Sequence, residues 1–496
     1  MSAEHFDVLI IGAGLSGIGS AYHLQAQCPG KTFAILEARD RIGGTWDLFR
    51  YPGIRSDSDM YTLGYRFRPW RDAKSIADGR SILQYVRDTA RENDIEQKIR
   101  FGHRAVLAEW SSEHARWRVE AQLADGEETT TFSASFLLMC SGYYRYDEGY
   151  TPSFAGSESF RGQIVHPQHW SDEIDYADKR VVVIGSGATA VTLVPALAQS
   201  ATHVTMLQRS PTYIVSLPAE DPIAKRLRRV LPERLVYPIV RWKNVLLTLL
   251  SFQLSRRRPA VAKAMLRKGL ERRLPPEYDI DTHFNPSYSP WQQRLCLVPD
   301  GDLFDAICDG RASVVTDQIE RFTESGIALR SGARLEADIV VTATGLNLLA
   351  LGGMRIVVDG DEVSPGRTMS YRGMMLSDVP NLAIVFGYTN ASWTLKADLT
   401  SEYVCRLLNH MNARGYSSVV ARRDPTMREQ PFIDFSSGYV VRSIDRFPRQ
   451  GERAPWRLYQ NYPLDILSLR YSPIEDGTLQ FSAGASKPAA AEAIAA

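Results

Sequence analysis

Two strand–glycine turn–helix segments, about 170 residues apart, constrain the fold of this chain more than any other feature. Residues 6–11 form a short apolar run that stops at Gly12, and residues 181–184 form another that stops at Gly185. After each turn, an apolar helical pattern leads into a second short strand. A strand, a glycine turn, a helix and a second strand make up the βαβ unit of nucleotide-binding domains. We therefore expect an α/β protein with two dinucleotide-binding (Rossmann-like) domains.

The first turn is a complete GxGxxG motif that spans residues 12–17. Gly12 permits the tight turn, Gly14 lets the backbone approach a pyrophosphate, and Gly17 allows the helix to pack closely on the strand. The phosphates would lie at the helix N-terminus, where free N–H groups and the helix dipole favour negative charge. Glu37 ends the second strand, 20 residues after Gly17, where a carboxylate binds ribose hydroxyls. This unit predicts a dinucleotide site.

The second turn has the related GxGxxA pattern, in which the expected phosphate-binding residues are Gly185, Gly187, Ala188 and Thr189. The second strand of this unit ends in Arg209 and Ser210, with no acidic residue. A carboxylate there would repel a 2′-phosphate, whereas an arginine would pair with it. The second site is therefore expected to prefer NADPH to NADH. The alternative is that Arg209 is an ordinary surface arginine.

Composition narrows the class of reaction. Two dinucleotide sites in one chain suggest electron transfer from NADPH to a second cofactor, most simply FAD. The five cysteines include no CxxC pair, which argues against a disulfide reductase, a disulfide framework and a cysteine zinc site. No metal site is expected, and molecular oxygen is a leading electron acceptor.

With 58 Lys and Arg against 57 Asp and Glu, the chain is not expected to bind nucleic acid through bulk charge.

Two further motifs resemble those of the Baeyer–Villiger monooxygenases, which are class B flavoprotein monooxygenases. Residues 160–170 match the signature FxGxxxHxxxW, and residues 43–57 match GGxWxxxxYPGxxxD. The related flavin-containing monooxygenases usually carry Tyr in place of Trp170. Many members of the family have Thr where this chain has Pro167. The resemblance extends over nearly the whole chain.

The resemblance implies a reaction. NADPH would reduce FAD, and the reduced flavin would react with O2 to give a C4a-peroxyflavin. This species would insert one oxygen atom into ketones to give esters or lactones, and it would also oxidise sulfides and thioamides. The alternative is a flavin-containing monooxygenase that acts on nitrogen or sulfur, for which a catalytic arginine should be dispensable.

The resemblance also implies roles for individual residues. The catalytic arginine of the family matches Arg294, and Asp57 should pair with it and hold it in place. A fixed cation suits a reaction in which negative charge develops, and arginine stays charged at working pH. Thr45 and Trp46 of the second motif, with Asp57, are expected to bind the cofactor. His166 is expected to couple the two domains rather than to transfer a proton.

Three further residues carry expectations of their own. Trp170 should pack at the junction of the two domains, and Cys140 should fill space beside the cofactor. Trp456 would lie over the nicotinamide or bury its ring, and the sequence leaves both alternatives open.

The domains are expected to interrupt one another along the chain. The FAD-binding domain would comprise residues 1–145 and 376–482, and the linker with the NADPH-binding domain would comprise 146–216 and 282–375. A basic helical insertion is expected over 217–281, and a flexible tail over 483–496.

The insertion has a distinctive composition. It contains fifteen Lys or Arg residues between Lys225 and Arg273, against only Glu233 and Glu271. It would either pack beside the active site or present a basic amphipathic surface to anionic lipid. No apolar run approaches about 20 residues, the length needed to span a bilayer. The N-terminus lacks a signal peptide pattern, so the expected compartment is the cytoplasm, with peripheral membrane contact through the insertion as an open alternative.

Overall fold

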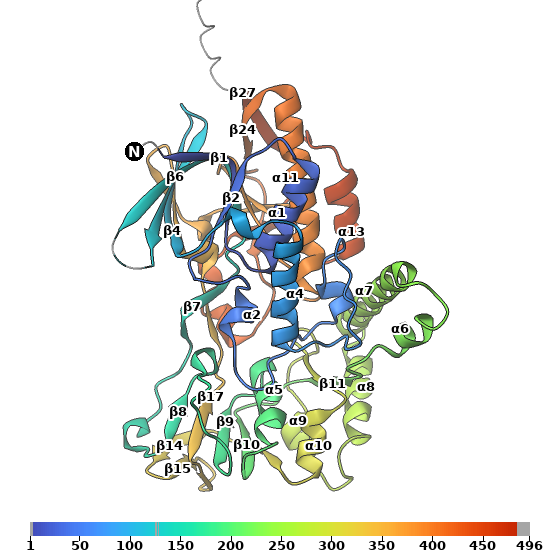
Figure 1. Ribbon diagram of the computed structural model, residues 1–496. Helices are drawn as coiled ribbons and strands as arrows, with labels where there is room; N and C mark the ends of the chain where they lie inside the picture. The colour runs from blue at the N-terminus through green and yellow to red at the C-terminus, as the bar shows by residue number, and fades with distance from the viewer. Residues whose placement is uncertain (1–2, 125, 127, 484–496) are drawn as a thin grey trace, which may run out of the picture.

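The computed structural model describes residues 3–483 apart from 125 and 127. In these residues the chain forms two α/β lobes, one above the other in Figure 1, with a group of helices beside them. Apart from Ala483, the tail expected over 483–496 lies outside the described residues.

The first lobe is built on a nine-stranded sheet that carries the first glycine turn. Its strands are β1 (Glu4–Ile11), β2 (Phe33–Leu36), β3 (Ile99–Arg100), β4 (His103–Ser111), β5 (Arg116–Leu123), β6 (Thr129–Met139), β19 (Arg355–Val358), β20 (Asp361–Val363) and β23 (Leu382–Ile384). The order is β20-β19-β4-β5-β6-β1-β2-β3, and β23 pairs with β6. The strands around β1 pair in parallel, whereas β4, β5 and β6 form an antiparallel meander.

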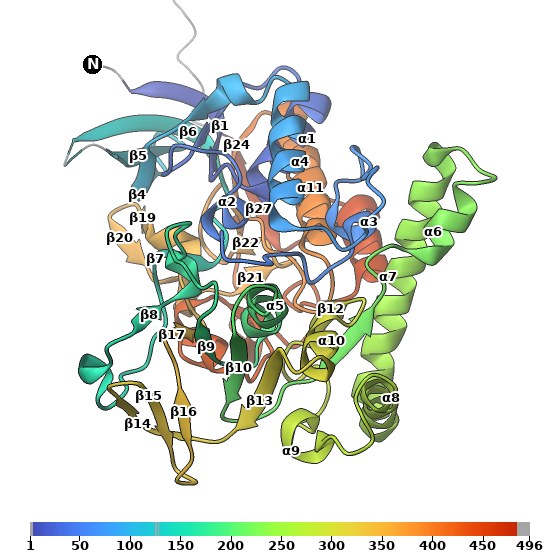
Figure 2. The same cartoon turned by 60° about the horizontal axis from the view of Figure 1, so that its bottom comes forward.

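Three helices cover one face of this sheet. They are α1 (Leu15–Gln27), α4 (Gly79–Glu92) and α11 (Trp393–Arg414), which lie side by side in Figure 2. Val8 and Ile10 of β1 point into the apolar core beneath these helices, and Leu9 points into a second core on the opposite face. Because the strand is buried on both faces, its sequence is a continuous apolar run rather than an alternating one.

The second lobe is built on a five-stranded sheet that carries the second glycine turn. Its strands are β8 (Gln163–Val165), β9 (Arg180–Ile184), β10 (His203–Gln208), β13 (Ala312–Thr316) and β17 (Ile339–Thr342), in the order β13-β10-β9-β17-β8. All four pairings are parallel. Helices α5 (Ala188–Leu197) and α10 (Asp302–Cys308) bury their apolar residues against this sheet. The expected fold class, α/β with two Rossmann-like units, is confirmed.

A small antiparallel ribbon joins the two lobes. It consists of β7 (Tyr144–Gly149) and β18 (Leu346–Leu348), and β7 lies between the two lobes in Figure 1. After β18 the chain re-enters the first lobe, because β19 pairs with β4 and β20 pairs with β19. This placement differs from the expected boundary at residue 375. A short apolar strand does not indicate which sheet it joins, and we now propose that the second part of the NADPH-binding domain ends near β18.

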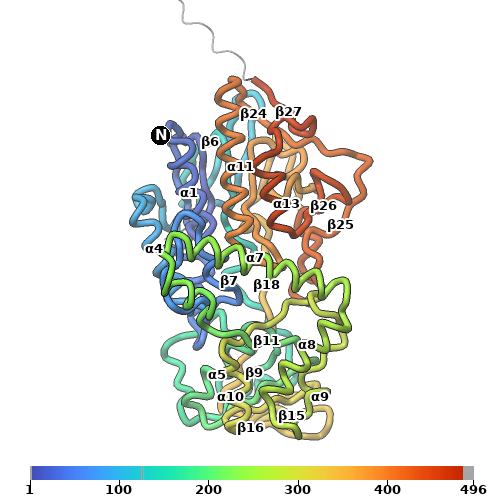
Figure 3. The backbone as a smooth tube through the Cα atoms, turned by 90° about the vertical axis from the view of Figure 1, so that its right-hand side faces the viewer, coloured from blue at the N-terminus to red at the C-terminus, as the bar shows by residue number. Residues whose placement is uncertain are grey.

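The basic segment is helical. It forms α6 (Pro222–Leu227), α7 (Glu233–Arg257), α8 (Pro259–Glu271) and α9 (Ile280–Phe284), and it runs along one side of both lobes in Figures 2 and 3. Among the described helices, α7 is long and apolar enough to cross a bilayer by length and composition, contrary to the sequence-based expectation. Some globular-protein helices meet the same criterion, and 28% of the most apolar window of α7 is buried in the protein.

Candidate active site

Two glycines of the first turn, Gly12 and Gly17, have neighbours that leave no room for a side chain. A Cβ atom on Gly12, whose φ is 106°, would lie 2.6 Å from the carbonyl oxygen of Cys140. A Cβ on Gly17 would lie 1.9 Å from the carbonyl oxygen of Gly12. Gly14 immediately precedes α1, and a Cβ on it would lie 3.6 Å from the Cα of Gly44. The turn therefore packs tightly against the sheet and brings bare backbone to the N-terminus of α1.

Glu37 lies at the end of β2 with its carboxylate buried. Its Oε2 accepts a hydrogen bond from the N–H of Ala13 at 2.7 Å, and its Oε1 accepts one from the N–H of Arg39 at 3.0 Å. Burial raises the pKa of Glu37, an effect that the two N–H donors oppose. Each carboxylate oxygen can accept a further hydrogen bond. Because Glu37 also lines a cavity, hydroxyl groups of a ligand can provide the donors.

The cavity extends from Glu37 to Arg294 and has a volume of about 480 Å³. Gly12 and Gly14 of the first turn line it, as do several residues of the GGxWxxxxYPGxxxD motif. The lining residues of that motif are Gly43, Gly44, Thr45, Trp46, Phe49, Tyr51, Ile54, Arg55, Ser56 and Asp57.

The residues around this cavity fit FAD. The helix N-terminus at Gly14 suits a pyrophosphate, and the carboxylate of Glu37 suits ribose hydroxyls. The Oγ1 atom of Thr45 lies 3.5 Å from the phenolic oxygen of Tyr146, so polar groups line the cavity beside the glycines. Within the described residues, no cluster of His, Cys, Asp and Glu side chains could hold a metal ion.

The second glycine turn opens onto the same cavity. Gly185 has a φ of 135°, and a Cβ there would lie 2.3 Å from the carbonyl oxygen of Ala343. Gly187 directly precedes α5, and a Cβ on it would have no heavy atom within 4 Å, so this position is open to a ligand. Ala188 and Thr189, the first residues of α5, line the cavity. The first glycine turn and the first residues of α5 therefore line one cavity.

The end of β10 carries the residues expected to recognise the 2′-phosphate. Arg209 and Ser210 are both exposed there. The hydroxyl of Ser186 donates to the carbonyl oxygen of Ser210 at 3.1 Å, which ties the end of β10 to the second glycine turn. Arg209, which directly precedes Ser210, therefore lies at the strand end that is tied to the second glycine turn.

Arg294 and Asp57 form an ion pair in the cavity, with 2.7 Å between Nε and Oδ2. About a third of each side chain is exposed, and both line the cavity. Burial opposes the charge of Arg294, but the carboxylate of Asp57 and nearby tyrosine hydroxyls raise the pKa of the guanidinium above its ordinary value. The arginine is therefore a permanent cation with a fixed position. The two residues come from segments more than 230 positions apart in the chain.

Aromatic residues surround this pair. Tyr143 stacks on Trp393, with 5.3 Å between the ring centroids and 11° between the planes. The indole N–H of Trp393 donates to the hydroxyl of Ser16 in the first helix at 2.8 Å. The hydroxyls of Tyr143 and Tyr144 lie 2.9 Å apart, and burial raises the pKa of both phenols. Both phenols therefore stay protonated; one donates to the other, and the second can donate a hydrogen bond to a further group.

These tyrosines were missed by the sequence reasoning. Tyr143 and Tyr144 follow directly on Ser141 and Gly142, small residues at the end of an apolar strand, and small residues there let backbone approach a cofactor. A third tyrosine, Tyr439, also acts electrostatically on Arg294, but nothing in its local sequence indicates this.

The FxGxxxHxxxW segment lies at the ribbon between the lobes. The Nε2–H of His166 donates to the carbonyl oxygen of Gly345 at 3.1 Å, and its Nδ1 accepts from the N–H of Gln168 at 3.2 Å. A Cβ on Gly149 would lie 2.0 Å from the imidazole, so the ring packs directly on β7. The side-chain amide of Gln168 donates to the carbonyl oxygen of Tyr146 at 2.8 Å. The segment therefore holds the connection between the lobes.

Three other residues have clear positions. Trp456 is 1% exposed and packs edge-on against Tyr371, so the alternative with a buried ring is the one observed. Trp170 packs against the core of the second lobe beside Tyr176. Cys140 is buried, with its Sγ 3.5 Å from the hydroxyl of Ser20, and burial raises the pKa of its thiol to about 12.

Comparisons with known proteins agree with this architecture. Residues 74–350 match the family model described as flavin-binding monooxygenase-like, and residues 10–73 match an NAD(P)-binding Rossmann-like domain. The chain is 56% identical over 481 residues to the FAD-containing monooxygenase EthA of Mycobacterium tuberculosis, covering 97% of this chain and 98% of that protein. It is 50% identical to a probable FAD-binding monooxygenase, AlmA, of an Acinetobacter species, with 96% of each chain covered.

Solved structures share the fold at low sequence identity. A steroid monooxygenase bound to NADP superposes with a TM-score of 0.74 at 22% identity, covering 97% of this chain and 100% of that chain. A cyclohexanone monooxygenase from Rhodococcus superposes with a TM-score of 0.69 at 19% identity, covering 86% of this chain and 87% of that chain.

The two Rossmann-like units and the relatives define the chain as a flavoprotein. It belongs to the flavin-binding monooxygenase-like family. The chain is therefore a flavin monooxygenase, with FAD and NADPH as its cofactors.

Proposed function

We propose that this monooxygenase is of the Baeyer–Villiger type and inserts one oxygen atom of O2 into ketones to give esters or lactones. The observation that carries the proposal is the Arg294–Asp57 ion pair, which lies in the cavity that the first glycine turn and the first residues of α5 line. Bound FAD, reduced by NADPH, supplies the activated oxygen. In our proposal the glycine turns hold the two cofactors, with Thr45 and Trp46 beside the flavin and Arg209 and Ser210 at the 2′-phosphate.

Arg294 acts on the charge that develops during oxygen transfer. Attack on a ketone places negative charge on its carbonyl oxygen, and a fixed cation in a cavity stabilises such charge without reorganising. The contact with Asp57 engages Nε, so the terminal nitrogens of the guanidinium can donate to the substrate. Asp57 is thus a positioning residue, because it holds the arginine at one place. The raised pKa of Arg294 keeps it charged at any working pH.

A ketone is the first substrate to test, and sulfides and thioamides are the next. A structural neighbour is named as a cyclohexanone monooxygenase, which supports a ketone. Oxidation of sulfur or nitrogen without ketone oxidation is the competing activity, and it would not require the arginine cation.

The test is product analysis by mass spectrometry. Purified protein is incubated with NADPH, air and an alkyl or aryl methyl ketone, and the products are compared with those of a methyl aryl sulfide. The expected product is an ester that is heavier than the ketone by one oxygen atom. If several ketones give no ester while the sulfide yields sulfoxide, the proposal is wrong and the heteroatom monooxygenase replaces it.

A further inference from the structure

One face of α7 is apolar and exposed. Its side chains recur at intervals of three or four residues, so they lie along one side of the helix. They are Leu235, Ile239, Trp242, Leu246 and Leu250, with exposed fractions between 44% and 64%. Exposed apolar side chains that occur singly need no explanation, but a contiguous row of them marks an interaction surface.

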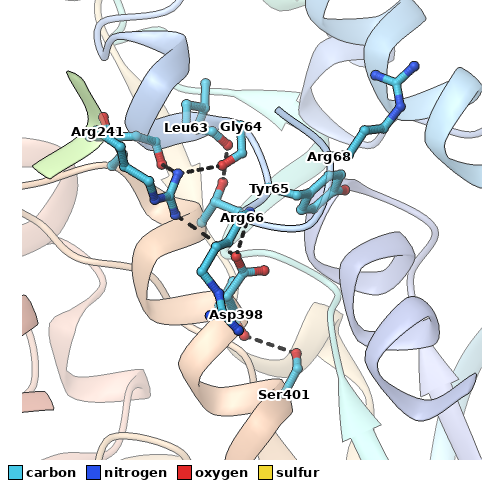
Figure 4. A network of polar contacts seen from close by, with 12 residues as sticks. Leu63, Gly64, Tyr65, Arg66, Arg68, Arg241, Asp398 and Ser401 are labelled. Atoms are coloured by element: carbon cyan, nitrogen blue, oxygen red, sulfur yellow. Dashed lines mark hydrogen bonds and ion pairs between the residues drawn. The ribbon is translucent and has the colours of Figure 1, made fainter. Parts of the chain in front are cut away.

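The opposite face of α7 is anchored to the first lobe, as Figure 4 shows for Arg241. The Nη1 atom of this buried arginine donates to the carbonyl oxygens of Tyr61 at 2.6 Å and Gly64 at 2.8 Å. Its Nη2 atom lies 4.0 Å from the carboxylate of Asp398 in α11. If α7 crossed a bilayer, these contacts would break and bury a charge in hydrocarbon. The helix therefore stays on the protein, with its apolar row facing outward.

A second exposed apolar segment continues the row. Helix α13 (Tyr462–Ile466) and the turn after it lie beside α7 in Figure 3, and the rings of Trp242 and Tyr462 are 5.8 Å apart. Leu464, Leu467 and Tyr471 of this segment are 45%, 61% and 73% exposed. We call these three residues together with the row on α7 the α7–α13 face.

A basic residue lies at the end of the apolar row. The fifteen Lys and Arg between residues 225 and 273 include Arg257, which lies in the last turn of α7 seven residues beyond Leu250 and so continues the apolar row. Arg257 is exposed and takes part in none of the ion pairs formed by the described residues. Apolar side chains with an aromatic ring, bordered by cations, are the composition of a helix that lies in the interface of an anionic membrane.

We propose that the α7–α13 face docks this enzyme onto an anionic phospholipid bilayer, with α7 parallel to the membrane plane. Leu246, Leu250 and Leu467 enter the boundary between headgroups and acyl chains, and Arg257 lies against the lipid phosphates. This membrane binding does not depend on which substrate the enzyme oxidises, so the proposal does not rest on the proposed function.

The test is co-sedimentation of the FAD-loaded, full-length enzyme with vesicles. One set contains equal parts of phosphatidylcholine and phosphatidylglycerol, and the other contains phosphatidylcholine alone. Binding is expected to the anionic set, with weaker binding to the neutral set and at high salt, because salt screens the attraction of Arg257 to the phosphates. The double variant Leu246→Glu, Leu250→Glu should lower the partition coefficient about 100-fold, about tenfold for each side chain.

Phe101→Glu is the matched control, since Phe101 is an exposed apolar residue at the far edge of the first sheet. It should leave vesicle binding unchanged. Retained FAD and unchanged vesicle-free NADPH oxidation show that the double variant is folded. Wild-type protein that does not bind anionic vesicles would overturn the proposal, as would a double variant that binds like the wild type. Analytical ultracentrifugation tests whether a second copy of this chain covers the face instead. A dimeric wild type and a monomeric double variant, with no vesicle binding by either, would make this face a self-association surface.

Discussion

Replacing Arg294 by alanine removes the one cation that the proposed reaction requires. A unit charge about 4 Å from a developing oxyanion contributes about 4 kcal/mol at an effective dielectric constant of about 20, which corresponds to about 10³ in rate. Mutations that remove a single preorganised oxyanion donor cost about 10²–10³ in kcat. We therefore expect Arg294→Ala to lower the rate of ester formation by about 10²–10³.

The same variant should keep its cofactor. About a third of each side chain of the Arg294–Asp57 pair is exposed, so removal of the Arg294 side chain changes the cavity more than it disturbs the packing of the core. Flavin absorbance per chain should equal that of the wild type, and NADPH oxidation should continue without ester.

The assay quantifies ester by gas chromatography and NADPH by absorbance in the same reaction. Asp57→Asn is the companion variant, because it keeps the shape of the side chain while it removes the carboxylate that positions the arginine. It should reduce ester formation by about tenfold, the effect of weakening one charged hydrogen bond. Ester formation by Arg294→Ala at the wild-type rate would refute the reasoning, because the cation would then contribute nothing to oxygen transfer.

Three further outcomes are expected. Arg209→Ala should raise the KM for NADPH by about tenfold and leave that for NADH nearly unchanged, because only NADPH carries the 2′-phosphate; equal effects in steady-state kinetics would contradict the assignment. Gly17→Ala should yield protein with little bound FAD by absorbance, since its Cβ would lie 1.9 Å from a carbonyl oxygen, whereas Gly30→Ala, with no atom within 4 Å, should bind FAD normally. Arg241→Met should destabilise the protein by about 3 kcal/mol, seen as a lower Tm, because it leaves the buried carbonyl oxygens of Tyr61 and Gly64 without this donor and removes a cation 4.0 Å from Asp398; an unchanged Tm would show that α7 does not depend on this anchor.

The local sequence was sufficient to predict both nucleotide-binding units. In each unit, an apolar strand, a turn in which backbone conformation and contact require glycine, and a helix that begins at the turn are all encoded within about 30 residues. The start of α1 after Gly14 and the start of α5 after Gly187 agree with those predictions. The position of Glu37 at the end of β2 follows from the same local pattern.

Tertiary structure decided the features that depend on distant segments. The strand at 355–358 joins the first sheet, and no local pattern distinguishes the edge of one sheet from that of another. The tyrosines around Arg294 come from the ribbon and from the C-terminal part of the chain, and they meet the arginine only in the folded protein. Which face of α7 is covered was also undetermined, because the helix is apolar on both sides and only the docking of Arg241 into the turn at Gly64 selects the buried one. Sequence periodicity specifies local structure, whereas burial and electrostatic pairing depend on which surfaces the whole fold brings together.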